Sequence, residues 1–181
     1  MFSHISRFGL FLAAIILVGL PGGAFAQTSE EAQSRALLVT PLSFVNERDL
    51  DFGQIIAGDT AGTIVMDSTG AVTTSGGVVQ IAGTQQTARF WGYGTFNQRV
   101  LINVDANNYI LTREGGTETM LLDQILIGSR PPVQINQNPR RFRIANRDGY
   151  FSFTLAGRLQ VGANQAPGVY SGEFTVVLEY E

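Results

Sequence analysis

The amino-acid sequence predicts an all-β protein, a β-sandwich built from short strands. Apolar and polar residues alternate with a period of two over residues 149–181, as expected for strands with one buried face. No window of useful length shows the 3.6-residue period of an amphipathic helix. Turn-forming residues recur at close spacing, which favours a sandwich of about nine to eleven strands over alternating strand–helix units.

The first residues predict a secretory leader that is not part of the fold. Arg7 precedes an uninterrupted apolar run from Phe8 to Leu20, and a Pro-Gly-Gly tripeptide ends this run. Ala24-Phe25-Ala26 then matches a small-x-small cleavage site. The run is shorter than the about 20 apolar residues of a spanning helix. We therefore expect a signal peptide over residues 1–26 and one mature domain over residues 27–181 with no transmembrane segment; an uncleaved anchor is the alternative.

Composition limits the function classes of the mature chain. The sequence has no cysteine, so disulfides and a cysteine-linked lipid anchor are excluded, and an exported domain must depend on its hydrophobic core. The formal net charge is −3, with 15 acidic and 12 basic residues. A mildly acidic chain argues against nucleic acid as a partner.

The first half of the mature chain predicts short strands between turns. An apolar stretch runs from residue 36 to residue 45, and Pro41 within it indicates an edge position or a bulge. Ile64 and Met66 share one face of a short strand that ends at an Asp-Ser-Thr-Gly turn. Val79 and Ile81 mark the next strand.

The middle of the chain gives the clearest local signals. Apolar residues alternate over residues 99–104, which predicts a strand with one buried face. Two strand-like runs, 109–113 and 119–127, flank Glu114-Gly115-Gly116-Thr117, a typical hairpin turn. Residues 129–137 contain two prolines and predict an extended loop, and a further short strand is expected around residues 142–144.

Residues 149–181 predict two alternating strands joined by a polar turn, which we interpret as a half-buried β-ribbon that a second apolar sheet must cover. The expected inward positions of the first strand are Phe151, Phe153, Leu155, Leu159 and Val161. Those of the second are Tyr170, Phe174, Val176, Leu178 and Tyr180. Only Glu181 follows Tyr180, so the sheet is expected to end one strand short, with an edge open to pairing with another chain.

The residue types available make an enzyme the disfavoured interpretation. The single histidine, His4, lies in the leader, and the chain contains no cysteine and no lysine. The usual triads, thiol sites, lysine nucleophiles and zinc sites therefore cannot form. A carboxylate pair such as Asp49 and Asp51 could act in glycoside hydrolysis, but polar faces and turns explain the acidic residues more simply. We predict no catalytic residue, no cofactor and no metal; turns at residues 67–70 and 105–108 are weak calcium candidates.

Two local clusters could bind a ligand. Arginines concentrate in one segment, at Arg130, Arg140, Arg141, Arg143 and Arg147. They could contact an anionic polymer such as a surface polysaccharide, or simply form a solvated strand face. Phe90, Trp91 and Tyr93 could form an aromatic platform for sugars, or fill the core.

Three stretches together resemble the bacterial family called domain of unknown function 4402, whose members are exported β-sandwich proteins. These stretches are Asp49-Leu50-Asp51-Phe52-Gly53-Gln54-Ile55-Ile56-Ala57-Gly58, residues 157–165 and residues 167–180. The ending is also similar to that of spore coat protein U-type pilins and other chaperone–usher subunits, which finish on an alternating strand with a penultimate tyrosine, here Tyr180. The resemblance implies an immunoglobulin-like, pilin-like sandwich that lacks its final strand, and a chaperone or a neighbouring subunit fills the gap by strand addition.

These observations lead to two functional hypotheses. The first is a non-catalytic structural subunit of a pilus or fimbrium, in the periplasm or on the surface of a Gram-negative bacterium. Its assembly strand would be Phe174, Val176, Leu178 and Tyr180, and its partners would be further copies or related subunits, a periplasmic chaperone and an usher. The alternative is a self-complete sandwich for adhesion or glycan binding, with contacts from Trp91, Tyr93, Arg140, Arg141 and Arg143.

Overall fold

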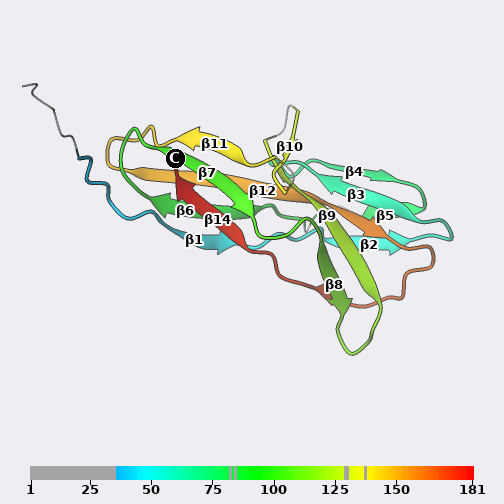
Figure 1. Cartoon of the computed structure of the whole chain (residues 1–181). Helices are drawn as coiled ribbons and strands as arrows, with labels where there is room; N and C mark the ends of the chain where they lie inside the picture. The colour runs from blue at the N-terminus through cyan, green and yellow to red at the C-terminus, as the bar shows by residue number, and fades with distance from the viewer. Residues whose placement is uncertain (1–35, 82, 84, 129–130, 137) are drawn as a thin grey trace, which may run out of the picture. The chain divides into compact units, whose positions relative to one another are not determined.

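The computed structural model describes residues 36–181 except 82, 84, 129, 130 and 137, so the predicted leader lies outside the described residues. The chain divides into Met1–Ala36 and Leu37–Glu181, and the second unit contains all of the strands (Figure 1). The described residues form fourteen strands and no helix, which confirms the all-β prediction. The strands are β1 (Ser43–Arg48), β2 (Gln54–Ala57), β3 (Gly62–Met66), β4 (Val72–Ser75), β5 (Val78–Ile81), β6 (Ala88–Tyr93), β7 (Arg99–Val104), β8 (Tyr109–Arg113), β9 (Thr119–Ile127), β10 (Val133–Gln134), β11 (Arg140–Arg143), β12 (Tyr150–Val161), β13 (Tyr170–Ser171) and β14 (Val176–Tyr180).

The largest sheet has nine strands and is organised around β12. Its main path is β1-β6-β12-β9-β8-β13, with β10 added to β9, and with β3 and then β4 added to β12. The first half of β12 pairs with β6 and its last residues pair with β3, while β9 lies along the other edge. Because β12 is twelve residues long, one strand connects two otherwise separate groups of strands.

The alternation predicted for β12 is confirmed. Phe151, Phe153, Leu155, Leu159 and Val161 are all buried, and polar residues alternate with most of them. Gly157 lies in the same inward row, where a Cβ atom would come within 2.7 Å of the Gln124 carbonyl oxygen. The row therefore needs a glycine at this position so that β9 can approach closely.

A second sheet contains three strands in the order β11-β7-β14. The central strand, β7, buries Val100, Ile102 and Val104, as its alternation predicts. Aromatic contacts join this sheet to the large one: the ring centroids of Phe142 on β11 and Phe151 on β12 lie 5.1 Å apart. The fold is therefore β-sandwich-like, with apolar side chains from both sheets in one core.

Short strands between β1 and β6 form two further pairs. β2 pairs with β5 as a separate two-stranded sheet, and β3 pairs with β4. Ile64 and Met66 on β3 are fully buried, as their shared face predicts. Val79 and Ile81 on β5 are instead about half exposed, so the apolar pattern there does not mark the core.

The predicted terminal ribbon is wrong in its pairing. β12 belongs to the nine-stranded sheet and β14 to the three-stranded one, so the two segments do not pair with each other. The second predicted strand is also divided into β13 and β14, which is one reason why the strand count exceeds nine to eleven. Residues 162–169 connect β12 to β13 within the nine-stranded sheet, and residues 172–175 then carry the chain to β14 in the three-stranded sheet. Alternation alone does not distinguish such a connection from a hairpin turn.

Two other local predictions have clear outcomes. The hairpin at residues 114–117 is confirmed, because β8 and β9 pair antiparallel across it. No helix that could span a membrane occurs in the described part of the chain.

Candidate functional site

The first candidate site is the outer edge of β14. Hydrogen bonds join the Asp105 amide to the Thr175 carbonyl (3.2 Å) and the Glu181 amide to the Arg99 carbonyl (3.1 Å), one at each end of the β14–β7 ladder. Hydrogen-bonded positions alternate in an antiparallel ladder, so odd-numbered residues of β14 direct their main-chain groups at β7.

The main-chain N–H and C=O groups of Val176, Leu178 and Tyr180 therefore point to the opposite edge of β14. Within the described residues, no strand pairs with that edge, because β14 is the last strand of its sheet. The predicted open edge thus corresponds to a row of main-chain donors and acceptors available to another chain.

The side chains of the predicted assembly strand contact the core without being fully covered. Phe174, Val176, Leu178 and Tyr180 are partly buried and pack against the buried cluster. Phe174 packs on Tyr109 with ring centroids 5.9 Å apart. The apolar face of β14 is therefore directed inward as predicted, but it keeps exposed apolar surface.

Tyr180 connects the C-terminal strand to the segment before β1. Its hydroxyl donates a hydrogen bond to the Thr40 carbonyl (2.7 Å) and accepts one from the Thr95 amide (2.8 Å). Gly94 makes room for this contact, since a Cβ atom there would lie 2.7 Å from the tyrosine hydroxyl. We call this pair of hydrogen bonds the Tyr180 bridge; it fixes one end of β14.

An apolar cleft lies between residues 50–57 and residues 165–170. The second of these segments precedes β14 in the sequence. The volume of the cleft is about 730 Å³. Leu50, Ile55, Leu111, Met120 and Leu159 are among the side chains that line it. A cleft of this size accommodates several apolar side chains of a ligand or of another polypeptide.

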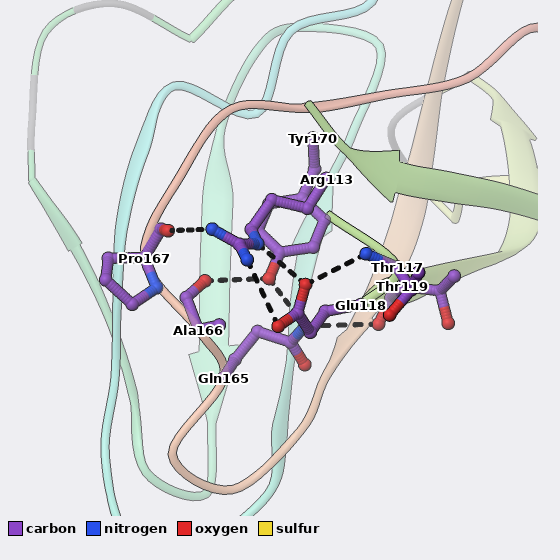
Figure 2. Close-up of polar contacts among 8 residues, drawn as sticks. All are labelled: Arg113, Thr117, Glu118, Thr119, Gln165, Ala166, Pro167 and Tyr170. Carbon is purple, nitrogen blue, oxygen red and sulfur yellow. Dashed lines mark hydrogen bonds and ion pairs between the residues drawn. The ribbon is translucent and has the colours of Figure 1, made fainter. Parts of the chain in front are cut away.

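Polar contacts hold the 165–170 wall of this cleft in place, as Figure 2 shows. The Tyr170 hydroxyl donates to the Ala166 carbonyl (2.7 Å) and accepts from the Gln165 amide nitrogen (2.8 Å). The Gln165 side chain also donates to the Thr119 carbonyl (3.2 Å), and Arg113 reaches the Pro167 carbonyl (3.5 Å). The wall is therefore fastened to the β8–β9 hairpin.

Arg113 and Glu118 form the ion pair at the centre of Figure 2, with their closest nitrogen and oxygen atoms 2.7 Å apart. The hydrogen bonds from Arg113 lower the pKa of the Glu118 carboxyl, and the same contacts raise the pKa of Arg113. Both groups stay charged at neutral pH, so the pair serves to hold the loop and is not poised for proton transfer.

Asp105 and Tyr109 form a second polar contact near the start of β14. The Tyr109 hydroxyl donates to the Asp105 carboxylate (2.7 Å), which also accepts from the Thr175 amide (3.3 Å). Burial, together with this hydrogen bond, raises the pKa of Tyr109 to about 12, and the hydrogen bond lowers the pKa of Asp105. The predicted turn at residues 105–108 thus anchors β14.

Trp91 and Tyr93 lie on the outer face of the large sheet, while Phe90 beside them is buried. Trp91 is 41% exposed and Tyr93 39%, so core filling is wrong for these two residues. Tyr150, which the sequence analysis did not single out, joins them: its ring centroid lies 5.4 Å from that of Tyr93, nearly edge-on. The guanidinium of Arg89 lies over the Trp91 ring, 5.1 Å from the centroid, and covers one of its faces.

The predicted arginine contacts belong to the other sheet. Arg140, Arg141 and Arg143 lie on β11 and are exposed, whereas Trp91 and Tyr93 lie on β6. Arg141 forms an ion pair with Glu181, and Arg143 donates to the Asn97 side chain (2.8 Å). The aromatic and arginine residues therefore do not form a single site; Arg130 lies outside the described residues.

Several acidic residues form hydrogen bonds within the fold. Asp123 receives hydrogen bonds from Arg158 (2.9 Å) and Gln160 (2.7 Å). Burial disfavours its charged form, but these donors outweigh burial and lower its pKa below 3.8. The Asp51 carboxylate accepts from the Gly53 amide (2.7 Å) in a turn. Across the described residues, no group of three or more side chains is placed to hold a metal ion.

One protein family matches most of this chain. The family described as domain of unknown function (DUF4402) matches residues 42–180. The chain belongs to the DUF4402 family. This DUF4402 match begins just before β1 and includes all of β14, so it covers the free edge described above. Comparisons with curated proteins and with solved structures gave no match.

Three parts of the candidate site could not be found by reading this DUF4402 sequence. The cleft depends on the distance between segments more than one hundred residues apart in the chain. Tyr150 precedes the alternating run and has no pattern of its own. The penultimate tyrosine is apparent in the sequence, but its partners, Thr40 and Thr95, are not.

Proposed function

We propose that this protein is an exported, non-catalytic structural subunit with an incomplete immunoglobulin-like fold, which assembles by β-strand addition at the free edge of β14. In an immunoglobulin-like sandwich, strands A, B, E and D form one sheet in that order, and C, F and G form the other. The order of strands in the two sheets supports this assignment.

The correspondence follows the order of the chain. If β1, β6, β7, β9, β12 and β14 are strands A to F, the large sheet contains A-B-E-D and the small sheet places C beside F. The remaining strands are then additions to this framework. The place of strand G lies next to β14, along the edge to which Val176, Leu178 and Tyr180 direct their main-chain groups.

The free edge of β14 is the observation that carries the proposal. A donated strand would gain main-chain hydrogen bonds from this edge, and its side chains would cover the exposed parts of the β14 apolar face. The donor is a related subunit or a periplasmic chaperone, and an usher would organise assembly in the periplasm or at the cell surface.

A proline at Leu178 tests the proposal. The Leu178 N–H points away from β7, so Leu178→Pro removes a donor from the free edge but leaves the β7 ladder intact. Leu178→Ala is the matched control, since it also shortens the side chain but keeps the N–H. The mature chain is titrated with a synthetic peptide of alternating large apolar residues, and uptake is followed by calorimetry and by the rise in melting temperature.

Wild type and Leu178→Ala should take up the peptide, and Leu178→Pro should not while remaining folded by circular dichroism. A reordered peptide of the same composition, without alternation, should not bind. Equal uptake by the proline and alanine variants, or no uptake by wild type, would overturn strand addition at β14.

The second candidate function is glycan binding on the outer face of the large sheet. The partly exposed rings of Trp91, Tyr93 and Tyr150 favour it, because sugars stack on aromatic faces. The arginines of β11 would take no part, as they lie on the other sheet. Binding on a glycan array that is lost in Tyr93→Ala, with an unchanged melting temperature, would support this function; an array without binding would exclude it.

A further inference from the structure

Among the described residues, no strand pairs with either outer edge of the three-stranded sheet, and the outer faces of its two edge strands carry opposite charge. On β11, Phe142 packs against the core, so Arg141 and Arg143 on either side of it face outward. On β14, the same alternation turns Glu179 and Glu181 outward. One edge strand is therefore basic on its outer face and the other is acidic.

Pairing with the central strand β7 places these charged residues at matching positions along the strand direction. Arg141 and Glu179 lie opposite the same β7 residue, Leu101. Arg143 pairs with Arg99, and the Glu181 amide donates to the Arg99 carbonyl, so these two residues also share one β7 neighbour. A copy of the sheet shifted sideways, perpendicular to its strands, would thus place each arginine beside a glutamate.

The direction and main-chain groups of the two edges also match. β11 and β14 are both antiparallel to β7 and so are parallel to each other (Figure 1). The Ile144 amide donates to the Gln98 carbonyl (3.0 Å) at the end of the β11–β7 ladder, so Arg141 and Arg143 direct their main-chain groups outward. In a parallel pair of strands, the main-chain groups of one residue bond to the two residues that flank its neighbour on the other strand. The outward main-chain groups of even-numbered residues on β14 and odd-numbered residues on β11 fit this pattern.

We infer that this protein self-associates by adding β11 of a second copy, in parallel, to the free edge of β14; this rests on the proposed strand-addition function and names its partner. The main-chain groups of Tyr180 bond to those of Arg141 and Arg143 in the second copy. Glu179 then lies beside Arg141 and Glu181 beside Arg143, at the spacing of about 4.8 Å between paired strands. The core-facing sides of the two three-stranded sheets, one from each copy, then lie on the same side of the joined sheet.

Such a contact is head-to-tail and leaves β11 of the first copy and β14 of the second copy free. Repetition without ring closure gives an open-ended filament. The ion pair between Arg141 and Glu181 within one chain does not prevent this contact. The Arg141 side chain in it is 63% exposed, so the pair readily exchanges for one between copies.

Charge reversal on each edge tests the inference with the full mature chain. Arg141→Glu/Arg143→Glu makes both edges acidic, and Glu179→Arg/Glu181→Arg makes both edges basic. The fourfold variant exchanges the two charges. Association is measured by sedimentation velocity over a range of protein concentrations, at ionic strengths of about 0.01 M and about 1 M, which set weak and strong screening.

Wild type should associate, and each double variant alone should lose about tenfold or more in apparent affinity, because like charges then meet at the contact. An equimolar mixture of the two double variants should associate again, as should the fourfold variant. Salt should weaken the association of wild type. Arg147→Glu, a reversal at an exposed site outside β11 and β14, should behave as wild type.

Thermal melts of each variant separate lost association from lost folding. A wild type that stays monomeric, or folded double variants that associate like wild type, would overturn the inference. If the monomeric wild type still takes up the alternating peptide, strand addition at β14 stands and β11 is not its partner.

Discussion

The Tyr180 bridge gives the most direct test of how the C-terminal strand is held. Tyr180→Phe removes only the hydroxyl that contacts Thr40 and Thr95. The Thr40 carbonyl lies at an exposed contact, where water can replace the lost donor. The Thr95 amide is part-buried and would lose its acceptor.

The expected cost is about 1–2 kcal/mol in the free energy of unfolding, because a part-buried donor is left without a partner. For a domain of this size the melting temperature should fall by roughly 3–6 °C. Amide hydrogen exchange at Thr95 should accelerate by about tenfold, since each 1.4 kcal/mol corresponds to a factor of ten. Calorimetry and exchange followed by nuclear magnetic resonance measure both effects on the same sample.

Tyr150→Phe is the matched control. Tyr150 is 58% exposed, and its hydroxyl has no hydrogen-bond partner in the described part of the chain, so its removal should leave the melting temperature unchanged. Equal melting temperatures for the two variants, or unchanged exchange at Thr95 in Tyr180→Phe, would refute the reasoning.

Three further predictions concern packing and pH. Gly92→Ala should lower the free energy of unfolding, measured by chemical denaturation, by about 1–3 kcal/mol, because a Cβ atom would lie 2.2 Å from the Phe151 ring. An equal loss in a Phe151→Leu background would contradict this cause. The pKa of Asp123 is lowered below 3.8, so its contribution to stability is present above that pH and is lost as the pH falls through the folded pKa. The free energy of unfolding from urea denaturation should therefore change less between about pH 2 and pH 5 in Asp123→Asn than in wild type. An equal change with pH in the two proteins would argue against this contribution. The pKa of Tyr109 is raised to about 12, so its contribution is present below its unfolded pKa of about 10 and is lost as the pH rises towards 12. An ultraviolet titration of wild type should show a late-ionising component that is missing in Tyr109→Phe, and its persistence in the variant would exclude Tyr109 as the source.

The sequence by itself determined the local pattern of this protein. Alternation placed the inward side chains of β7 and β12 correctly, because a pleated strand turns successive residues to opposite faces. The hairpin between β8 and β9 followed from its glycine-rich turn. The absence of a helical period gave the fold class.

Only the tertiary structure decided which strands are neighbours. Alternation assigns a residue to a face but does not choose the partner strand, so β12 and β14 read as a ribbon although they lie in different sheets. For the same reason Trp91 and Tyr93 could not be assigned to the core or to the surface. The opposed charges on β11 and β14 became visible only when β7 placed these distant segments on either side of itself, because pairing between strands is a long-range choice.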